Sequence, residues 1–209
     1  MKLYIYQHCP FCARVRYVAA TLGIRLEEII VDYSDNTSIN QIIGKKIVPL
    51  LIKENGEPMT ESNDIIQYLM SLQATTYTAP LAGTADWQSR AFPLLQAIGY
   101  PRWAELDLGE FQSPASKALW KDKKQTPELN FERLIEHTDE IVSQVNLLVI
   151  DAEKALQLSA GESALVLTDQ AIYFSILRGF YSEASVTWPP HLDAWLHQQS
   201  ARLSIPLLR

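Results

Sequence analysis

The two cysteines of this chain stand close together near its amino terminus, and their surroundings constrain the fold more than any other feature. Cys9 and Cys12 follow a short strand-like run at residues 2–6 and open a helical pattern. That pattern places apolar residues at steps of three and four: Phe11, Val15, Val18 and Leu22. The sequence therefore predicts that Cys9 lies where a strand ends and a helix begins.

This position favours a reactive thiol at Cys9. The free amides of a first helical turn and the positive end of the helix dipole stabilise a thiolate. Thiols at such helix ends titrate at roughly 3.5–7.5, whereas a free cysteine titrates at about 8.5. Pro10 falls at the first helical position, where its missing N–H is not needed. Cys12 is one turn further on the same face, within disulfide reach of Cys9.

Two other interpretations of this motif are weaker. Half of a zinc site would need a second pair of ligands, and the chain has no further cysteine. The four histidines show no paired ligand spacing: His8, His137, His191 and His197. A structural disulfide closing so short a loop would constrain the unfolded chain only slightly. A redox-active dithiol with no metal is therefore the favoured interpretation.

Composition limits the partners and the location we expect. The 209 residues are 47% hydrophobic and 20% charged, as in ordinary globular proteins. A net charge of −6 argues against a nucleic acid or an anionic membrane as partner. We see no signal peptide and no apolar run of the roughly 20 residues that a membrane span needs. With one CxxC pair and no export signal, we expect a cytoplasmic protein.

The first seventy residues alternate strand and helix patterns. The expected elements are a strand at 2–6, a helix ending at Gly23, a largely buried strand at 26–31, a helix at 37–43 ending at Gly44, a strand at 50–52, a hairpin at Asn55-Gly56, an edge strand at Pro58 and a helix with Ser62 as N-cap. A strand, a helix and a strand within about thirty residues indicate a parallel βαβ unit. The whole order is thioredoxin-like.

Three motifs in this order resemble those of glutaredoxins. Residues 4–12 are similar to the glutaredoxin active-site segment, whose usual form is Cys-Pro-Tyr-Cys; here Phe11 replaces the tyrosine. Residues 46–49 resemble the loop that carries the cis-proline of that family. Residues 61–65 resemble the acidic-serine segment that glutaredoxins share with glutathione transferases. The resemblance implies a thioredoxin-like domain at residues 1–72.

The resemblance also implies a glutathione site. A cis peptide before Pro49 would turn the Val48 backbone outward beside the thiol, as an edge to which an extended peptide can add. The helix end at Ser62 would receive the γ-glutamyl carboxylate, and Glu61 would pair with the ammonium of that group. Lys46 would meet the glycyl carboxylate. Cys9 and Phe11 complete the predicted set.

The rest of the chain is expected to be helical. Residues 73–85 have no sustained period and predict a linker, followed by an all-helical domain at 86–209. Pro93 should kink or divide the first helix, and Pro101 should open another. The pattern at residues 128–156 predicts one long helix. Thr168 is expected to cap a further helix at 169–179. The basic cluster Lys121–Lys124 is interpreted as a solvated helix end.

This organisation resembles the glutathione-transferase architecture. Three stretches of the second domain are similar to two-domain bacterial glutaredoxins built on that plan: 101–103, 110–115 and 121–124. Transferase-like second domains often carry Ser/Thr-x-x-Asp at the start of a buried helix. Here the matching position reads Leu167-Thr168-Asp169-Gln170, which departs from that pattern.

The resemblance implies a glutathione-dependent thiol–disulfide oxidoreductase. Cys9 would be the nucleophile and Cys12 the resolving thiol, with glutathione as cosubstrate and no permanently bound cofactor. Its partners would be glutathione and disulfide-bonded or glutathionylated proteins, and we expect a monomer. One alternative is a glutathione transferase or dehydroascorbate reductase on the same scaffold. Another is a non-enzymatic interaction protein. The intact dithiol argues against both.

Overall fold

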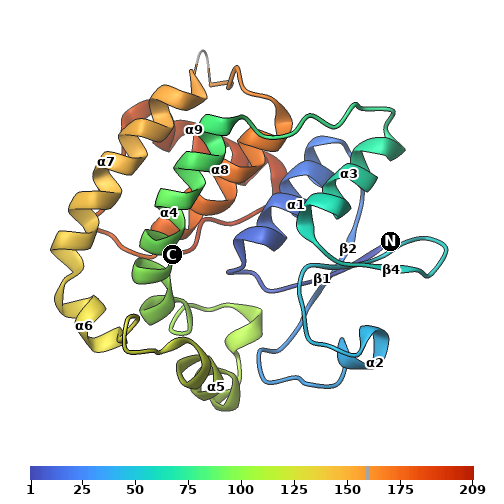
Figure 1. Cartoon of the computed structure of the whole chain (residues 1–209), viewed down its shortest axis with the longest axis horizontal. Coiled ribbons are helices and arrows are strands. Elements are labelled where there is room, and N and C mark those ends of the chain that lie inside the picture. The colour runs from blue at the N-terminus through green and yellow to red at the C-terminus, as the bar shows by residue number, and fades with distance from the viewer. Residues whose placement is uncertain (159–160) are drawn as a thin grey trace.

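A computed structural model describes residues 1–158 and 161–209. The first part of the chain contains β1 (Lys2–Ile5), α1 (Pro10–Thr21), β2 (Glu27–Ile30), α2 (Asn40–Ile43), β3 (Leu50–Ile52), β4 (Pro58–Met59) and α3 (Ser62–Leu72). The second part contains α4 (Ala82–Trp103), the 3-10 helix η1 (Gly109–Phe111), α5 (Pro114–Lys124), α6 (Phe131–Glu136), α7 (Thr138–Leu156), α8 (Leu167–Phe180) and α9 (Pro190–Leu203). Figure 1 shows these two parts side by side, with α1 next to α8.

The sheet has the predicted thioredoxin-like topology. Its strand order is β2-β1-β3-β4, with β1 parallel to β2 and antiparallel to β3. Leu3 and Ile5 of β1 are fully buried, and Leu3 pairs in register with Leu51 of β3. The thioredoxin-like first part followed by a helical second part confirms the predicted fold class.

The prediction that residues 26–31 form a largely buried strand is wrong. β2 lies at one edge of the sheet, and Glu27, Glu28 and Ile30 are exposed. An apolar run in the sequence does not show whether its strand will lie at the centre or at the edge of the sheet. An edge strand pairs with only one other strand and is therefore less buried. At the opposite edge, Pro58 opens β4 as predicted.

Prolines do not divide the first helix of the second part. α4 continues through both Pro93 and Pro101, so neither proline divides the helix, and the predicted separate helix at Pro101 is wrong. The kink at Pro93 stays a prediction. Its buried residues Trp87, Leu95 and Ile98 lie on a helix that packs against α7 and α8. This packing compensates for the backbone hydrogen bonds that the prolines cannot donate. Conversely, the predicted single helix at 128–156 is broken at His137 into α6 and α7.

The start of α8 fastens the segment that connects the two parts. Thr168 is not the predicted cap, because α8 begins at Leu167 with Val166 as N-cap and no side-chain capping bond. Instead, the Thr168 hydroxyl donates to the Thr78 carbonyl at 2.8 Å. The Leu81 N–H donates to the buried Asp169 carboxylate at 2.9 Å.

α4 begins at Ala82, inside the stretch predicted as linker. The predicted division into 1–72, 73–85 and 86–209 stays a prediction.

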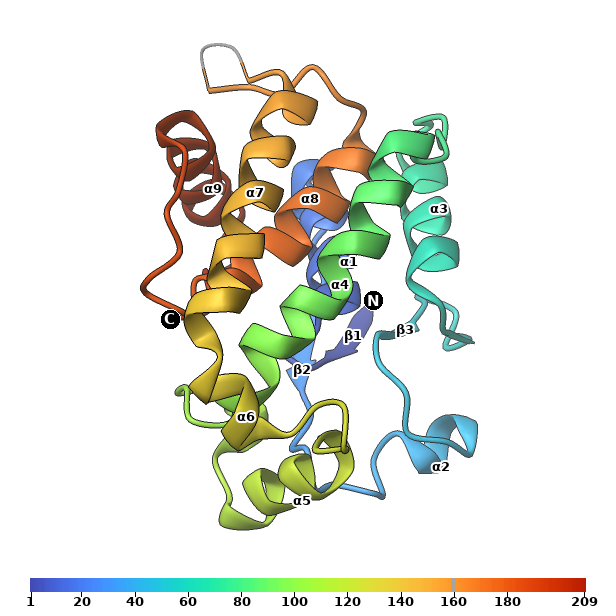
Figure 2. The same cartoon turned by 60° about the vertical axis from the view of Figure 1, so that its left-hand side comes forward.

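The two parts share one apolar core. α1 packs against α3 on one side and against α8 and α9 on the other, as Figure 2 shows from a second direction. The buried Tyr17 hydroxyl of α1 lies 3.1 Å from the Gln170 side chain and 3.2 Å from that of Gln199. Within the described residues, no helix combines the length and apolarity that crossing a membrane requires.

We expect Asp169→Ala to lower the free energy of unfolding. The substitution removes a fully buried carboxylate and leaves the Leu81 N–H without its acceptor. An unsatisfied group of this kind lowers the free energy of unfolding by about 1–3 kcal/mol. Urea unfolding of both proteins measures the difference. Asp169→Asn keeps an acceptor oxygen and should lose less. An unchanged midpoint for Asp169→Ala would show that this contact does not stabilise the fold.

Candidate active site

Cys9 caps the amino end of α1. Its backbone is extended, and the Cys12 N–H points to its Sγ at a donor–acceptor distance of 3.5 Å. Cys9 is 8% exposed, whereas Cys12, one turn further along the helix, is fully buried. Both are free thiols. Only one of the two sulfurs therefore reaches the surface.

The surroundings separate the two thiols electrostatically. A hydrogen bond from the Cys12 thiol lowers the pKa of Cys9. Burial opposes this effect, while the N–H groups of Cys12 and Phe11 and the charge of Arg14 add to it. Burial and the neighbouring Cys9 raise the pKa of Cys12 well above its ordinary value. Cys9 is thus favoured as the thiolate and Cys12 as its proton-bearing partner.

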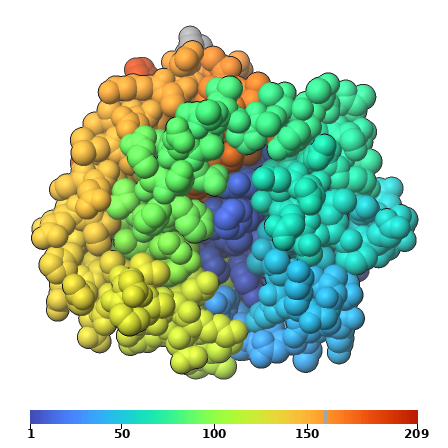
Figure 3. All heavy atoms as spheres, in the orientation of Figure 1, coloured from blue at the N-terminus to red at the C-terminus, as the bar shows by residue number. Residues whose placement is uncertain are grey.

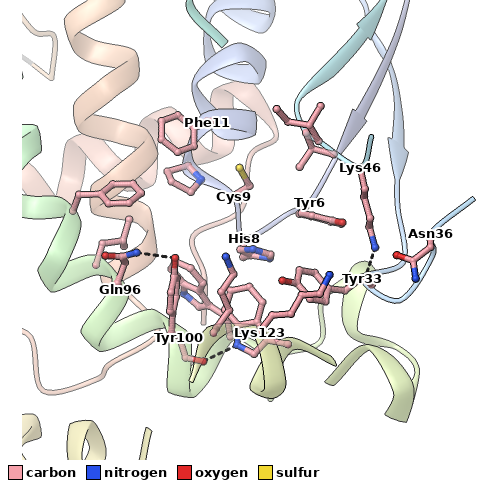
Figure 4. Close-up of a pocket in the computed structure, with 18 residues that line it drawn as sticks. Tyr6, His8, Cys9, Phe11, Tyr33, Asn36, Lys46, Gln96, Tyr100 and Lys123 are labelled. Carbon is pink, nitrogen blue, oxygen red and sulfur yellow. Dashed lines mark hydrogen bonds between the residues drawn. The ribbon is translucent and has the colours of Figure 1, made fainter. Parts of the chain in front are cut away.

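Cys9 lies at the floor of a cleft between the two parts of the chain, with a volume of about 360 Å³. Figure 3 shows this hollow, with the blue amino-terminal residues at its base. The first part contributes Tyr6, His8, Phe11, Tyr33, Lys46 and Val48. The second part contributes Phe92, Gln96, Tyr100, Lys123 and Lys124. In Figure 4, Cys9 lies between Lys46 on one side and Gln96 on the other.

Four residues of the predicted glutathione site line this cleft: Cys9, Phe11, Lys46 and Val48. The Val48–Pro49 peptide is cis, as predicted. The Lys46 ammonium donates a hydrogen bond to the Tyr33 carbonyl (Figure 4). Pro49, Glu61 and Ser62 are not among the residues that line the cleft. The roles of all seven residues in binding stay predictions.

The start of α3 differs from the predicted geometry. Ser62 is its first helical residue, and Glu61 occupies the N-cap position without a side-chain capping bond. The prediction of Ser62 as N-cap is therefore wrong by one residue. Glu61 has a φ of 66° and a ψ of 113°, a backbone conformation that side-chain-bearing residues rarely adopt. Such outliers persist where surrounding structure enforces them, often at ligand-binding positions.

His8, which the sequence did not suggest as a site residue, is buried beside Cys9. Its N–H donates to Glu110 Oε1 at 2.9 Å, and its Nδ1 lies 2.8 Å from the same oxygen. Burial lowers the pKa of His8, so its neutral ring donates through Nδ1 at neutral pH. Five aromatic rings surround it: Tyr6, Tyr33, Trp103, Phe111 and Trp120.

The residue before His8 is also held by the second part. The Gly109 N–H donates to the Gln7 side chain at 2.6 Å, and the buried Arg178 donates to the Gln7 carbonyl at 3.0 Å. Burial lowers the pKa of Arg178 to about 9, which leaves it a cation at neutral pH. The loop that precedes Cys9 is therefore fixed by η1 and α8.

Two further basic features lie close to Cys9. Arg14 of α1 is 4% exposed, and its guanidinium donates to the Gln88 side chain at 3.1 Å. Lys123 and Lys124 line the cleft; Lys123 is exposed, as a solvated helix end predicts, and Lys124 is half-buried. No group of three or more potential metal-ligating side chains occurs within residues 1–158 and 161–209.

Comparison with known proteins identifies the family. The model of the glutaredoxin 2 C-terminal domain matches residues 83–209, more than half of the chain. The chain belongs to the glutaredoxin 2 family. The model of the glutathione S-transferase N-terminal domain matches residues 3–76. Glutaredoxin 2 of Escherichia coli K12 is 26% identical, and the match covers 100% of this chain and 98% of that protein.

Solved structures agree with the fold. Glutaredoxin 2 of Salmonella typhimurium, in complex with glutathione, has a TM-score of 0.89 at 23% identity, covering 99% of this chain and 96% of that one. Human glutathione S-transferase T1-1 has a TM-score of 0.59 at 19% identity, covering 97% of this chain and 83% of that one. The difference in TM-score places the fold nearer to the bacterial glutaredoxin.

The pH dependence of alkylation tests the separation of the two thiols. We expect the rate of iodoacetamide modification to rise with a midpoint below that of an unperturbed cysteine thiol, because the pKa of Cys9 is lowered. The reactive thiolate is present above that midpoint and lost below it. Cys12→Ala should raise the midpoint, because it removes the thiol hydrogen bond that lowers the pKa of Cys9 most, while Cys12→Ser retains a donor and should raise it less. Equal midpoints in all three proteins would contradict this.

Proposed function

We propose that this protein is a glutathione-dependent thiol–disulfide oxidoreductase that reduces protein disulfides and glutathione mixed disulfides. The observation that carries the proposal is the Cys9 thiol, which caps α1 at the floor of the cleft and has a lowered pKa. A protonated Cys12 stands one turn behind it. Membership of the glutaredoxin 2 family supports the same chemistry.

In a first cycle, Cys9 alone acts on a glutathionylated protein. The Cys9 thiolate attacks the glutathione sulfur, the S–S bond to the protein breaks, and the protein leaves as a thiolate. Cys9 then carries glutathione as a mixed disulfide. A second glutathione thiolate attacks the bound glutathione sulfur, which releases the Cys9 thiolate and forms glutathione disulfide. One disulfide is consumed and one is formed.

In a second cycle, both cysteines act on a protein disulfide. The Cys9 thiolate attacks one sulfur, and the other leaves as a thiolate. The Cys12 thiol then gives up its proton and attacks Cys9 Sγ, which releases the substrate's second thiol and closes a Cys9–Cys12 disulfide. Two molecules of glutathione reduce that disulfide and leave as glutathione disulfide. The lowered pKa makes Cys9 both an ionised nucleophile and a good leaving group.

We propose that glutathione binds along the side of the cleft formed by the first part of the chain. Lys46 would meet the glycyl carboxylate, and the backbone at Val48 and Pro49 would offer an edge for the extended tripeptide. Glu61 and Ser62 would receive the γ-glutamyl group at the start of α3. The Salmonella relative, which was solved with glutathione, supports this ligand. Phe11 would pack against it beside Cys9.

In this proposal glutathione is a cosubstrate, and no cofactor or metal is permanently bound. The other partners are disulfide-bonded and glutathionylated proteins, encountered by a monomer in the cytoplasm.

The direct test is reduction of a glutathione mixed disulfide coupled to glutathione reductase. We expect Cys9→Ser to fall to the uncatalysed rate, because the nucleophile is lost. Cys12→Ser should keep substantial activity on the mixed disulfide, because the first cycle does not use it, and lose activity on a protein disulfide.

A different pattern would contradict the proposal. The unsubstituted protein, Cys9→Ser and Cys12→Ser are compared. If all three are equally inert on the mixed disulfide but conjugate a model electrophile to glutathione, the protein is a transferase. If none shows thiol turnover or conjugation, it is a binding protein on this fold.

A further inference from the structure

The far wall of the cleft plays no part in the steps described so far. This wall, which we call the α4–α5 wall, consists of Phe92, Gln96, Tyr100, Lys123 and Lys124. In Figure 4, Gln96 and Tyr100 lie across Cys9 from Lys46, and Lys123 lies between Tyr100 and Tyr33. Because glutathione is proposed to occupy the Lys46 side, the α4–α5 wall is left for the other half of the disulfide substrate.

The two lysines of this wall carry charges that are available for a ligand. Lys124 is half-buried, and its Nζ lies 5.5 Å from the ring centroid of Tyr100 and 5.7 Å from that of Trp120. In the part of the chain that the structure describes, neither Lys123 nor Lys124 forms an ion pair. Two unpaired cations in one cleft of a chain with net charge −6 favour an anionic ligand.

The same wall is also apolar. Phe92 of α4 lies against Phe11, with ring centroids 5.7 Å apart, and Leu95 adds an aliphatic side chain to the lining. Glutathione carries two carboxylates and an ammonium but no apolar side chain, so a second glutathione would leave this surface uncovered. A polypeptide segment with an apolar residue and an acidic residue near its cysteine would cover both features.

We propose that the α4–α5 wall binds the cysteine-bearing segment of the protein substrate, and that Lys123 and Lys124 select segments with an acidic residue beside the reacting cysteine. This inference rests on the proposed function, since it concerns the thiol partner of the same Cys9. In the step concerned, Cys9 Sγ bonds to the glutathione sulfur, and the acidic segment departs as a thiolate when its S–S bond breaks.

Three peptides of one length provide the test. Each has a single glutathionylated cysteine with a leucine on one side and an aspartate, asparagine or lysine on the other. The value of kcat/KM is measured for each in the assay coupled to glutathione reductase. We expect the aspartate peptide to exceed the lysine peptide by about three- to tenfold, the range for one or two partly exposed ion pairs. Added salt should reduce this ratio.

A double variant and a matched control assign the preference. Lys123→Gln with Lys124→Gln should bring the aspartate-to-lysine ratio to about one. Lys121→Gln removes a charge from the same last turn of α5 but not from the cleft, and should keep the ratio. An unchanged ratio in the double variant overturns the proposal. So does a raised KM for glutathione with no change in the ratio, which would assign the lysines to glutathione.

A second measurement separates failure of this inference from failure of the proposed function. In Cys12→Ser protein, the same three glutathionylated peptides are mixed with an excess of protein in the absence of free glutathione. Cys9 attacks the glutathione sulfur, the peptide leaves as a thiolate, and its release in this single transfer is followed by chromatography without glutathione turnover. A faster release of the aspartate peptide supports the subsite even if the coupled assay is inert. Equal release rates for the three peptides, in protein that also shows no preference in the coupled assay, overturn it.

Discussion

The contact between Glu110 and His8 is the interaction on which the site depends. One carboxylate oxygen of η1 accepts from both the backbone N–H and the ring of the residue just before Cys9. Glu110 is fully buried and His8 nearly so, and a hydrogen bond to a charged group contributes about 1.5–3 kcal/mol. Glu110 holds His8 in place, so the second part of the chain helps to position the residues around Cys9.

The charges around this contact explain how a buried thiol can stay reactive. Burial alone would raise the pKa of Cys9. The hydrogen bond from the Cys12 thiol reverses that effect, with smaller contributions from the N–H groups of the helix start and from Arg14. Arg178 places a second cation behind the loop, where it donates to the Gln7 carbonyl. Its charge also offsets that of Glu110. The same buried groups therefore position the loop and balance its charge.

Local signals in the sequence predicted the local parts of this site. The helix that begins after Cys9, the glycine with left-handed backbone at Gly23 and the edge position of Pro58 follow from neighbouring residues. The role of Glu110 did not, because its partner lies 102 positions away and a lone glutamate gives no sign of burial. The position of Lys124 at the cleft was not predictable for a related reason: the sequence of a basic helix end is the same whether it lies beside a cleft or on open surface.

Amide hydrogen exchange tests the central claim, that the second part of the chain holds the active-site loop. The N–H of His8 and that of Tyr33 both donate to Glu110, one to its side chain and one to its backbone carbonyl. If the two parts open only together, these amides exchange with the same free energy as Phe174 in the core of α8. Exchange of His8 and Tyr33 at a much lower free energy than Phe174 would contradict the account, because it would mean that the loop opens without the helical part.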